Sequence, residues 1–294
     1  MAISRYVIDR AKIDRFIKEG RGKGEGKEYK PWLTVYDVPS DGRVHRPRGL
    51  KTNRTHHLLS DIEYRHFLLL EWDPDVKDIR EQFPLDLDRT QAIAREAGIR
   101  HPRDTRSDED NVMTSDFLVV VGEGKRRKLV VWAVKPAEKL NDKRVVEKLE
   151  IERRYWMSIG GAEWHISTEL ELPMPRIESL EWLRGASDLA DVEEPSEGFL
   201  GVAAERIVSC IGFRSAGEQK LNALCASLDT KYAAPNGAHQ LIARHLLAHS
   251  VLLASLDRRK MWETDIADIE IDKKKLSALL ESLPVRPLAI DEAA

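Results

Sequence analysis

Hydrophobic residues recur at helical spacing in three segments of the first 160 residues. Residues 1–20, 60–72 and 141–158 each carry apolar positions separated by charged ones, which predicts amphipathic helices. Pro74 ends the second pattern, since proline does not continue a helix. In residues 91–112 a short helical pattern gives way to a charged stretch that predicts a polar loop.

Extended segments lie between and after these helices. VKDIREQFPLDL follows the second helix, VMTSDFLVVV and KLVVWAVKP are β-branched runs joined by GEGKRR, and AEWHIST follows the third helix. The short glycine-containing connection predicts a hairpin between the two β-branched runs. The order helix, strand, hairpin, helix, strand predicts a mixed sheet flanked by helices, in an α/β or α+β domain. We expect this first domain to occupy residues 1–170.

The remaining residues, 171–294, predict a second and mostly helical domain. The prolines of ELPMPRIESLEWLRG indicate a linker that leads into a helix, and helical periodicity follows in residues 199–212, 217–231 and 237–256. KMWETDIADIEID alternates apolar and polar residues as a small hairpin does. Three helices and a hairpin are the outline of a winged-helix domain, with KKKLSALLESL as one more helix.

The composition is that of an ordinary globular chain. Its 294 residues are 42% hydrophobic and 33% charged, which excludes a disordered polyelectrolyte and allows two domains. No apolar run approaches the roughly 18 residues of a membrane helix, and the charged N-terminus lacks the apolar stretch of a signal peptide. Cys210 and Cys225 lack metal-ligand spacing, which favours free thiols. We therefore expect a cytoplasmic protein without a membrane contact.

Charge is unevenly distributed along the chain. Residues 1–60 hold 14 Lys/Arg against 7 Asp/Glu, a net charge of +7. Because the net charge of the whole chain is -3, residues 61–294 carry a net charge of -10. A basic segment suits a polyanion, because each neutralised phosphate releases counterions. The alternative explanation of the same charge is a solvated, partly flexible arm. The acidic C-terminal part fits a protein partner better than naked DNA.

Asp116 opens the first strand of the predicted hairpin, and Lys135 closes the second. Because side chains alternate along a strand, positions 133 and 135 share a face, and the short loop brings Asp116 near both. Glu63 borders the apolar side of the second predicted helix, where a carboxylate needs a partner. Two carboxylates and a lysine can support Mg²⁺-dependent phosphodiester hydrolysis, with the Val134 carbonyl as a further metal ligand.

Each of these residues also has an ordinary structural interpretation. Ser60 and Glu63 are spaced as a capping box, in which Glu63 accepts a hydrogen bond from the Ser60 backbone N–H. Asp116 can simply begin a strand, and Lys135 can simply end one. An aspartate followed at a distance by Val-Lys is a weak pattern by itself, so the residues alone leave both interpretations open.

Several blocks within residues 56–170 resemble, in order and spacing, the TnsA family of endonuclease subunits of heteromeric Tn-seven-like transposases. The blocks are EQFPL, MTSDFLV, VKPA and EKLE-ERRYW. The resemblance implies a restriction-endonuclease-like core of the PD-(D/E)xK type, followed by a winged-helix domain. The family's metal-binding glutamate and aspartate fall on Glu63 and Asp116, and its lysine falls on Lys135.

Ala133 is the position where this sequence departs from the family pattern. The family places glutamine or glutamate there, whereas alanine has no oxygen to bind a metal or to orient water. Loss of one preorganised group can cost ~10²–10³-fold in rate. We therefore expect a chain that binds DNA but is impaired in cleavage, whether as a natural degenerate member or as a variant made inactive. The alternative is a site in which Glu63, Asp116 and the backbone suffice.

The resemblance further implies a reaction and its partners. The reaction is Mg²⁺-dependent hydrolysis of the non-transferred strand at the 5′ ends of a transposon during cut-and-paste transposition. The partners are transposon-end DNA, a TnsB-like transposase and a TnsC-like AAA+ ATPase that contacts the C-terminal domain. One alternative is a non-catalytic interaction module that recruits the ATPase and holds transposon-end DNA. A restriction or repair nuclease acting alone is another, which the lack of a strongly basic second domain disfavours.

Overall fold

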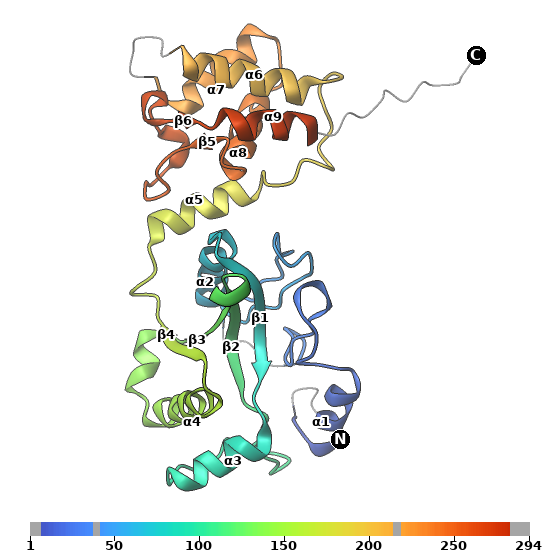
Figure 1. The fold of residues 1–294 in the computed structure, drawn as a ribbon, viewed down its shortest axis with the longest axis vertical. Coiled ribbons are helices and arrows are strands. Elements are labelled where there is room, and N and C mark those ends of the chain that lie inside the picture. The colour runs from blue at the N-terminus through green and yellow to red at the C-terminus, as the bar shows by residue number, and fades with distance from the viewer. Residues whose placement is uncertain (1–6, 38–41, 214–218, 283–294) are drawn as a thin grey trace, which may run out of the picture. The chain divides into compact units, whose positions relative to one another are not determined.

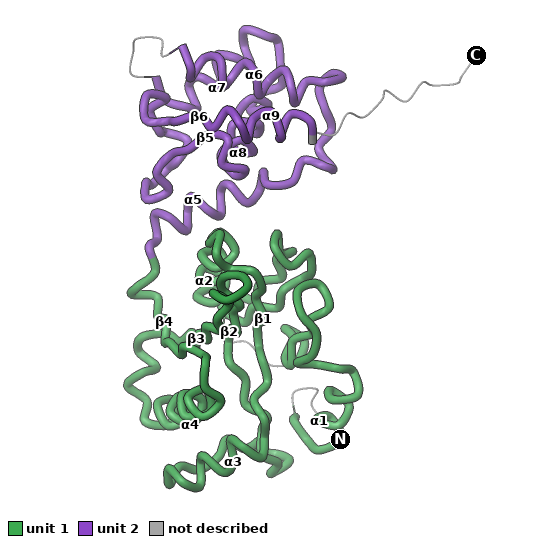
Figure 2. Tube along the Cα trace, in the orientation of Figure 1, with its two compact units in different colours: residues 1–172 green, residues 173–294 purple. Residues whose placement is uncertain are grey.

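Two units of the chain, residues 1–172 and 173–294, each have their own secondary structure (Figure 2). The computed structural model describes residues 7–37, 42–213 and 219–282. The boundary between the units falls two residues after the end that the sequence predicts for the first domain. Within the described residues, no helix combines the length and the apolar character needed to cross a membrane.

The first unit is built on a four-stranded mixed sheet in the order β1-β2-β3-β4 (Figure 1). β1 (Val76–Pro84) pairs antiparallel with β2 (Thr114–Val121), and β2 pairs antiparallel with β3 (Lys128–Val134). β4 (Ala162–Ser167) is parallel to β3, which requires a crossover that α4 (Lys143–Ile159) supplies. The predicted mixed sheet with its hairpin is confirmed.

Helices cover both faces of this sheet. α2 (Asp61–Trp72) packs Phe67 against Phe117 on one face. On the other face, α4 packs Ile151 against Leu118. Successive residues of β2 therefore enter different layers, as the two-residue period of a strand requires. The end of the sheet where β2 begins and β3 finishes thus lies between two helices that can each present side chains to it.

The basic N-terminal segment belongs to the fold of the first unit. α1 (Arg10–Lys18) buries Ile13 and Phe16 against Trp32, and the rings of Phe16 and Trp32 meet edge to face with centroids 5.2 Å apart. A solvated arm therefore does not describe this part of the segment. The predicted helix over residues 1–20 is shorter than expected, and its first six residues lie outside the described ones.

The next helix, α3 (Leu87–Glu96), begins earlier than the sequence pattern predicts. The prediction extended the preceding strand through Leu87 and started the helix at residue 91. The strand ends at Pro84 instead, and the Asp86 side chain accepts a hydrogen bond from the Arg89 backbone N–H at 2.8 Å. The prediction was wrong at this boundary because it overlooked an N-cap aspartate.

The second unit is mainly helical. Its helices are α5 (Met174–Arg184), α6 (Phe199–Gly212), α7 (Leu221–Lys231), α8 (Ala238–Ala248) and α9 (Lys273–Ser282). The predicted helix over 237–256 is too long, because Ser250 adopts a left-handed φ of 55° just after the helix ends. The other predicted helices are present, with modest changes at their ends.

The small sheet of the second unit differs from the predicted hairpin. β5 (Leu252–Leu253) pairs antiparallel with β6 (Glu270–Ile271), so the first strand lies before the segment 260–272. Within that segment, two 3₁₀ turns direct Met261 and Ile266 inward. A hairpin confined to residues 260–272 is therefore wrong. The helices and the two-stranded sheet fit the outline of a winged helix, which stays a prediction.

Candidate active site

Asp116 and Lys135 form an ion pair at one end of the sheet. Lys135 Nζ donates to Asp116 Oδ2 at 2.6 Å, and the Val134 backbone N–H donates to the same oxygen at 2.6 Å. Asp116 is only 7% exposed. Two neighbouring donors from the end of β3 thus hold a buried carboxylate at the start of β2, as the hairpin geometry predicts.

Glu63 reaches the same place from α2. Ser60 is the N-cap of this helix, and its Oγ accepts a hydrogen bond from the Glu63 backbone N–H at 3.1 Å. The Glu63 carboxylate accepts from the Leu59 backbone N–H at 2.9 Å and from the Ser60 hydroxyl at 3.3 Å. The predicted N-cap is confirmed, but the carboxylate bonds Leu59 instead of the Ser60 backbone.

Glu63 and Asp116 lie close enough to repel each other. Burial, and then the charge of Asp116, raise the pKa of Glu63 to about 8. The hydrogen bond from Leu59 and the charge of Lys135 act in the opposite direction but are weaker. A carboxyl group with this pKa is mostly protonated at neutral pH, and a bound cation would favour its ionised form.

Glu152 is a third carboxylate at this site, and it was missed in the sequence. It lies on α4, is 5% exposed, and its Oε1 finds no hydrogen-bond partner among the described residues. Burial, followed by the charge of Asp116, raises the pKa of Glu152 to about 7. The available signal was its helical spacing with Leu149 and Trp156, both buried, since a charged residue on a buried stripe needs a partner.

Ala133 lies beside these carboxylates on β3 and is fully buried. The register pairs Phe117 with Trp132, so one further step along the ladder sets Asp116 opposite Ala133. Cβ atoms of such cross-strand neighbours are about 4.5–5.5 Å apart. A glutamine or glutamate at this position would therefore lie next to the Asp116 carboxylate, where alanine contributes only a methyl group.

A cavity of about 920 Å³ adjoins these residues within the first unit. Its walls combine the N-terminal segment, the start of α2, the residues before β2 and the first turns of α4. Polar and apolar groups both line it, among them Trp32, Leu33, Glu63, Lys135 and Glu152. The cavity is large enough to admit a segment of a substrate next to the carboxylates.

The donor set is compatible with a magnesium ion. In the part of the chain that the structure describes, no cluster of three or more His, Cys, Asp or Glu side chains could hold a metal by itself. Mg²⁺ commonly takes only one or two protein carboxylates and completes its shell with water and substrate phosphates. A bound cation would stabilise the ionised form of Glu63, whose pKa is raised, and would give Glu152 Oε1 the partner that it lacks among the described residues. The residues present therefore fit a metal held chiefly by Glu63 and Asp116.

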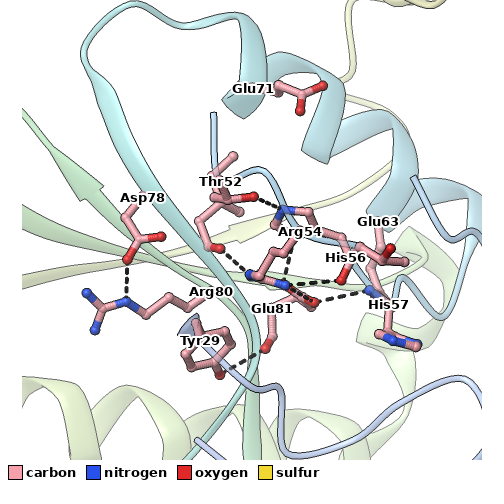
Figure 3. A network of polar contacts seen from close by, with 12 residues as sticks. Tyr29, Thr52, Arg54, His56, His57, Glu63, Glu71, Asp78, Arg80 and Glu81 are labelled. Carbon is pink, nitrogen blue, oxygen red and sulfur yellow. Dashed lines mark hydrogen bonds and ion pairs between the residues drawn. The ribbon is translucent and has the colours of Figure 1, made fainter. Parts of the chain in front are cut away.

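A second buried polar network lies next to α2 (Figure 3). Glu81 on β1 is 0% exposed and accepts hydrogen bonds from the Arg54 guanidinium at 2.7 and 2.6 Å. Its Oε2 lies 2.7 Å from His56 Nδ1, and its Oε1 accepts from the His57 backbone N–H at 3.1 Å. Burial alone would raise the pKa of Glu81, but His56 and Arg54 lower it well below its usual range.

This network fixes the chain segment that leads into α2. It anchors residues 54–57 on β1, only two residues before the Leu59 N–H that holds Glu63. Figure 3 shows Glu63 on the α2 side of the network. The basic charge of Arg54 therefore serves the interior of the protein, and it cannot contribute to a DNA-binding surface.

Comparisons with known proteins agree with this architecture. Residues 73–169 match the family described as "TnsA-like endonuclease N terminal", a region that contains Asp116, Ala133, Lys135 and Glu152 but not Glu63. The "Transposon Tn7 transposition protein TnsA" of Escherichia coli is 49% identical over 183 residues. That alignment covers 62% of this chain and 66% of the relative, just under two thirds of the relative's length.

Proposed function

We propose that this chain is the DNA-cleaving subunit of a transposase, because residues 73–169 match the TnsA-like endonuclease family and the chain is 49% identical over 183 residues to a TnsA protein. The proposed reaction is Mg²⁺-dependent hydrolysis of the non-transferred strand at the 5′ ends of the transposon. The observation that carries the proposal is the meeting of Glu63, Asp116 and Lys135 at one end of the sheet. A cytoplasmic location stays a prediction.

The roles of these side chains follow from their charges. Glu63 and Asp116 would hold the metal, with the Val134 carbonyl as a predicted further ligand, and a bound Mg²⁺ supplies Lewis-acid stabilisation and activates water. Burial lowers the pKa of Lys135, but Asp116 raises it overall, so Lys135 stays protonated at neutral pH. Its ammonium group can donate to the negative charge that develops on the phosphate.

Glu152 has the properties of a proton carrier in this site. Its pKa of about 7 lies near physiological pH, where a carboxyl group can both accept and release a proton. It lines the same cavity as Lys135, and one of its oxygens lacks a hydrogen-bond partner within the described structure. We assign it the acceptance of a proton from the attacking water.

Two partners belong to the proposal. The relative is named a transposition protein, and the acidic C-terminal half of this chain suits contact with other proteins. The second unit would contact a TnsC-like ATPase, and the first would act beside a TnsB-like transposase. Ala133 favours a second candidate function. A site that lacks the glutamine or glutamate side chain at this position can serve as a non-catalytic module that recruits the ATPase and holds DNA.

Nicking assays on substituted proteins separate the two functions. With Mg²⁺, the partner transposase and a duplex carrying a transposon end, Ala133→Gln or Ala133→Glu should raise nicking about 10²-fold over the present chain. Ala133→Leu adds comparable volume without an oxygen and should not. Asp116→Asn in the Ala133→Gln protein should abolish the gain. A folded Ala133→Gln protein that nicks no faster would leave the interaction module as the better account.

A further inference from the structure

The cations of α4 differ in how they are paired. Arg153 and Arg154 bond Glu150 at 2.8 and 2.6 Å, and Arg144 bonds Glu147 at 3.0 Å with Lys143 nearby at 3.9 Å. Lys148 is the exception on this helix. It makes no hydrogen bond or ion pair with any described residue, although Glu152 lies one helical turn further along.

Lys148 lines the cavity that adjoins the candidate active site. The same cavity is lined by Lys135, Glu152 and by Lys139 of the 3₁₀ turn before α4, and Lys139 is also unpaired in the described structure. Burial, followed by the charges of Arg144 and Lys135, lowers the pKa of Lys148. Burial and these two cations outweigh the attraction of Asp142, so an anion bound beside Lys148 would be stabilised.

The cavity needs such cations if a nucleic acid is to enter it. Its acidic lining includes Glu63 and Glu152 as well as Glu138 and Asp142, which repel phosphate. Lys135 is already paired with Asp116 and cannot offset all of these charges. Lys135 is assigned to the phosphate that is cleaved, so the unpaired lysines are the cations in the lining that remain available to a second phosphate group.

We propose that Lys148, assisted by Lys139, binds a backbone phosphate of the DNA strand next to the phosphate that is cleaved. Residues one helical turn apart are about 5–6 Å apart on a helix surface, so Lys148 stands beside Glu152, although it makes no ion pair with Glu152 or with any other described residue. Lys148 is a positioning residue: it holds the strand in register with Glu63, Asp116 and Lys135. The identity of the strand as a substrate rests on the proposed function.

The test compares two lysines of the same helix. Lys148→Met removes the charge and keeps most of the side-chain length, and Lys148→Arg keeps the charge. Lys143→Met is the matched control, because the Lys143 side chain is 90% exposed and does not line the cavity. Binding of each full-length protein to a fluorescently labelled 30-base-pair duplex is measured by anisotropy without divalent metal, at several salt concentrations.

Lys148→Met should weaken binding about 3–10-fold and should reduce the slope of log K against log salt by about 0.9, the value for one lost phosphate contact. Lys139→Met should give a smaller loss, Lys148→Arg should bind as the unchanged protein does, and Lys143→Met should have no effect. Thermal unfolding should be unchanged in all four, since neither Lys148 nor Lys139 has a partner among the described residues and Lys143 loses only a 3.9 Å pair of an exposed side chain with Glu147.

Three results would overturn the assignment. They are unchanged DNA binding by Lys148→Met, an equal loss in Lys143→Met, and no measurable binding of the duplex by the unchanged chain. Unchanged DNA binding by Lys148→Met would also be expected if the cavity binds an acidic protein segment instead of DNA. None of these results bears on nicking by Ala133→Gln. The proposed function can therefore stand if the phosphate site at Lys148 fails, and the phosphate site can stand if the nicking test fails.

Discussion

Two groups of buried ionisable side chains lie in the first unit, and they differ in how completely they are paired. Glu81 accepts hydrogen bonds from Arg54 and His57 and contacts His56, and its pKa is lowered. Glu63 and Glu152 are about as buried, yet their pKa values are raised to about 8 and about 7.

This difference separates a structural network from a site that needs a ligand. A buried charge with all its partners in place rigidifies the elements that supply them, which here are β1 and the segment before α2. Carboxylates that gather around one another without enough donors destabilise the folded state. Such groups persist in proteins chiefly where a metal or substrate completes the set.

The largest effect should come from breaking the satisfied network. Arg54→Met leaves Glu81 fully buried without its bidentate partner, and it should lower the free energy of unfolding by about 3–5 kcal/mol. Urea denaturation measures this directly. Arg43→Met is the control, because Arg43 is exposed and its ion pair among the described residues is with Asp61 at the surface, so the substitution should cost less than about 1 kcal/mol. Equal losses of unfolding free energy in the two variants would show that the buried network of Glu81 is no more stabilising than an exposed ion pair.

The pH dependence of stability should have opposite signs in the two groups. The pKa of Glu81 is lowered in the folded state, so its stabilising effect is present above its ordinary value of 4.5 and is lost as the pH falls below it. The pKa of Glu63 is raised to about 8, so stability is lost as the pH rises from 4.5 towards 8.

Substitutions of Glu63 and Glu81 reveal these opposite pH dependences of stability. The stability of Glu63→Gln relative to the unchanged protein should rise by about 1–3 kcal/mol between pH 5 and pH 8. Glu81→Gln should be destabilised by a constant amount over that range and should approach the unchanged protein only below pH 4.5. Urea midpoints at a series of pH values test both. Parallel slopes for the two variants would show that the carboxylates are not in contrasting surroundings.

The smallest effect should come from the residue that caps α2. Ser60→Ala removes the acceptor of the Glu63 backbone N–H and one donor to its carboxylate. The free energy of unfolding should fall by about 1 kcal/mol, as is usual for a lost N-cap. Ser158→Ala, which loses only a hydroxyl bond to the Tyr155 carbonyl near the end of α4, should change it by less than about 0.5 kcal/mol.

The sequence predicted the parts of this site that depend on local geometry. The short turn between two β-branched runs sets Asp116 near Lys135, and the capping pattern at Ser60 orients Glu63. Glu152 is one of many charges on its helix, and its helical spacing with Leu149 and Trp156 was the single sequence signal that it lies on the face that meets the sheet. The pairing of Arg54 with Glu81 joins a loop to a strand, and local periodicity carries no record of such a contact.

The same limit explains the errors in the second unit. The alternation in residues 260–272 resembles a strand, but 3₁₀ turns can bury every second or third residue as well. Only the pairing of β5 with β6, which are distant in sequence, decides between the two. Residues whose role depends on a distant partner were thus the ones that the sequence left undetermined.

If position 133 belongs to a metal site whose carboxylates are still in place, an oxygen-bearing side chain at this position should increase the affinity for Mg²⁺. Titration calorimetry with Mg²⁺ on this chain and on Ala133→Gln measures that affinity, with Asp116→Asn in the Ala133→Gln background as the control. Binding should be at least about tenfold tighter in Ala133→Gln, and the control should lose that gain. Equal affinity in the two proteins, or no binding in either, would show that position 133 does not belong to a metal site.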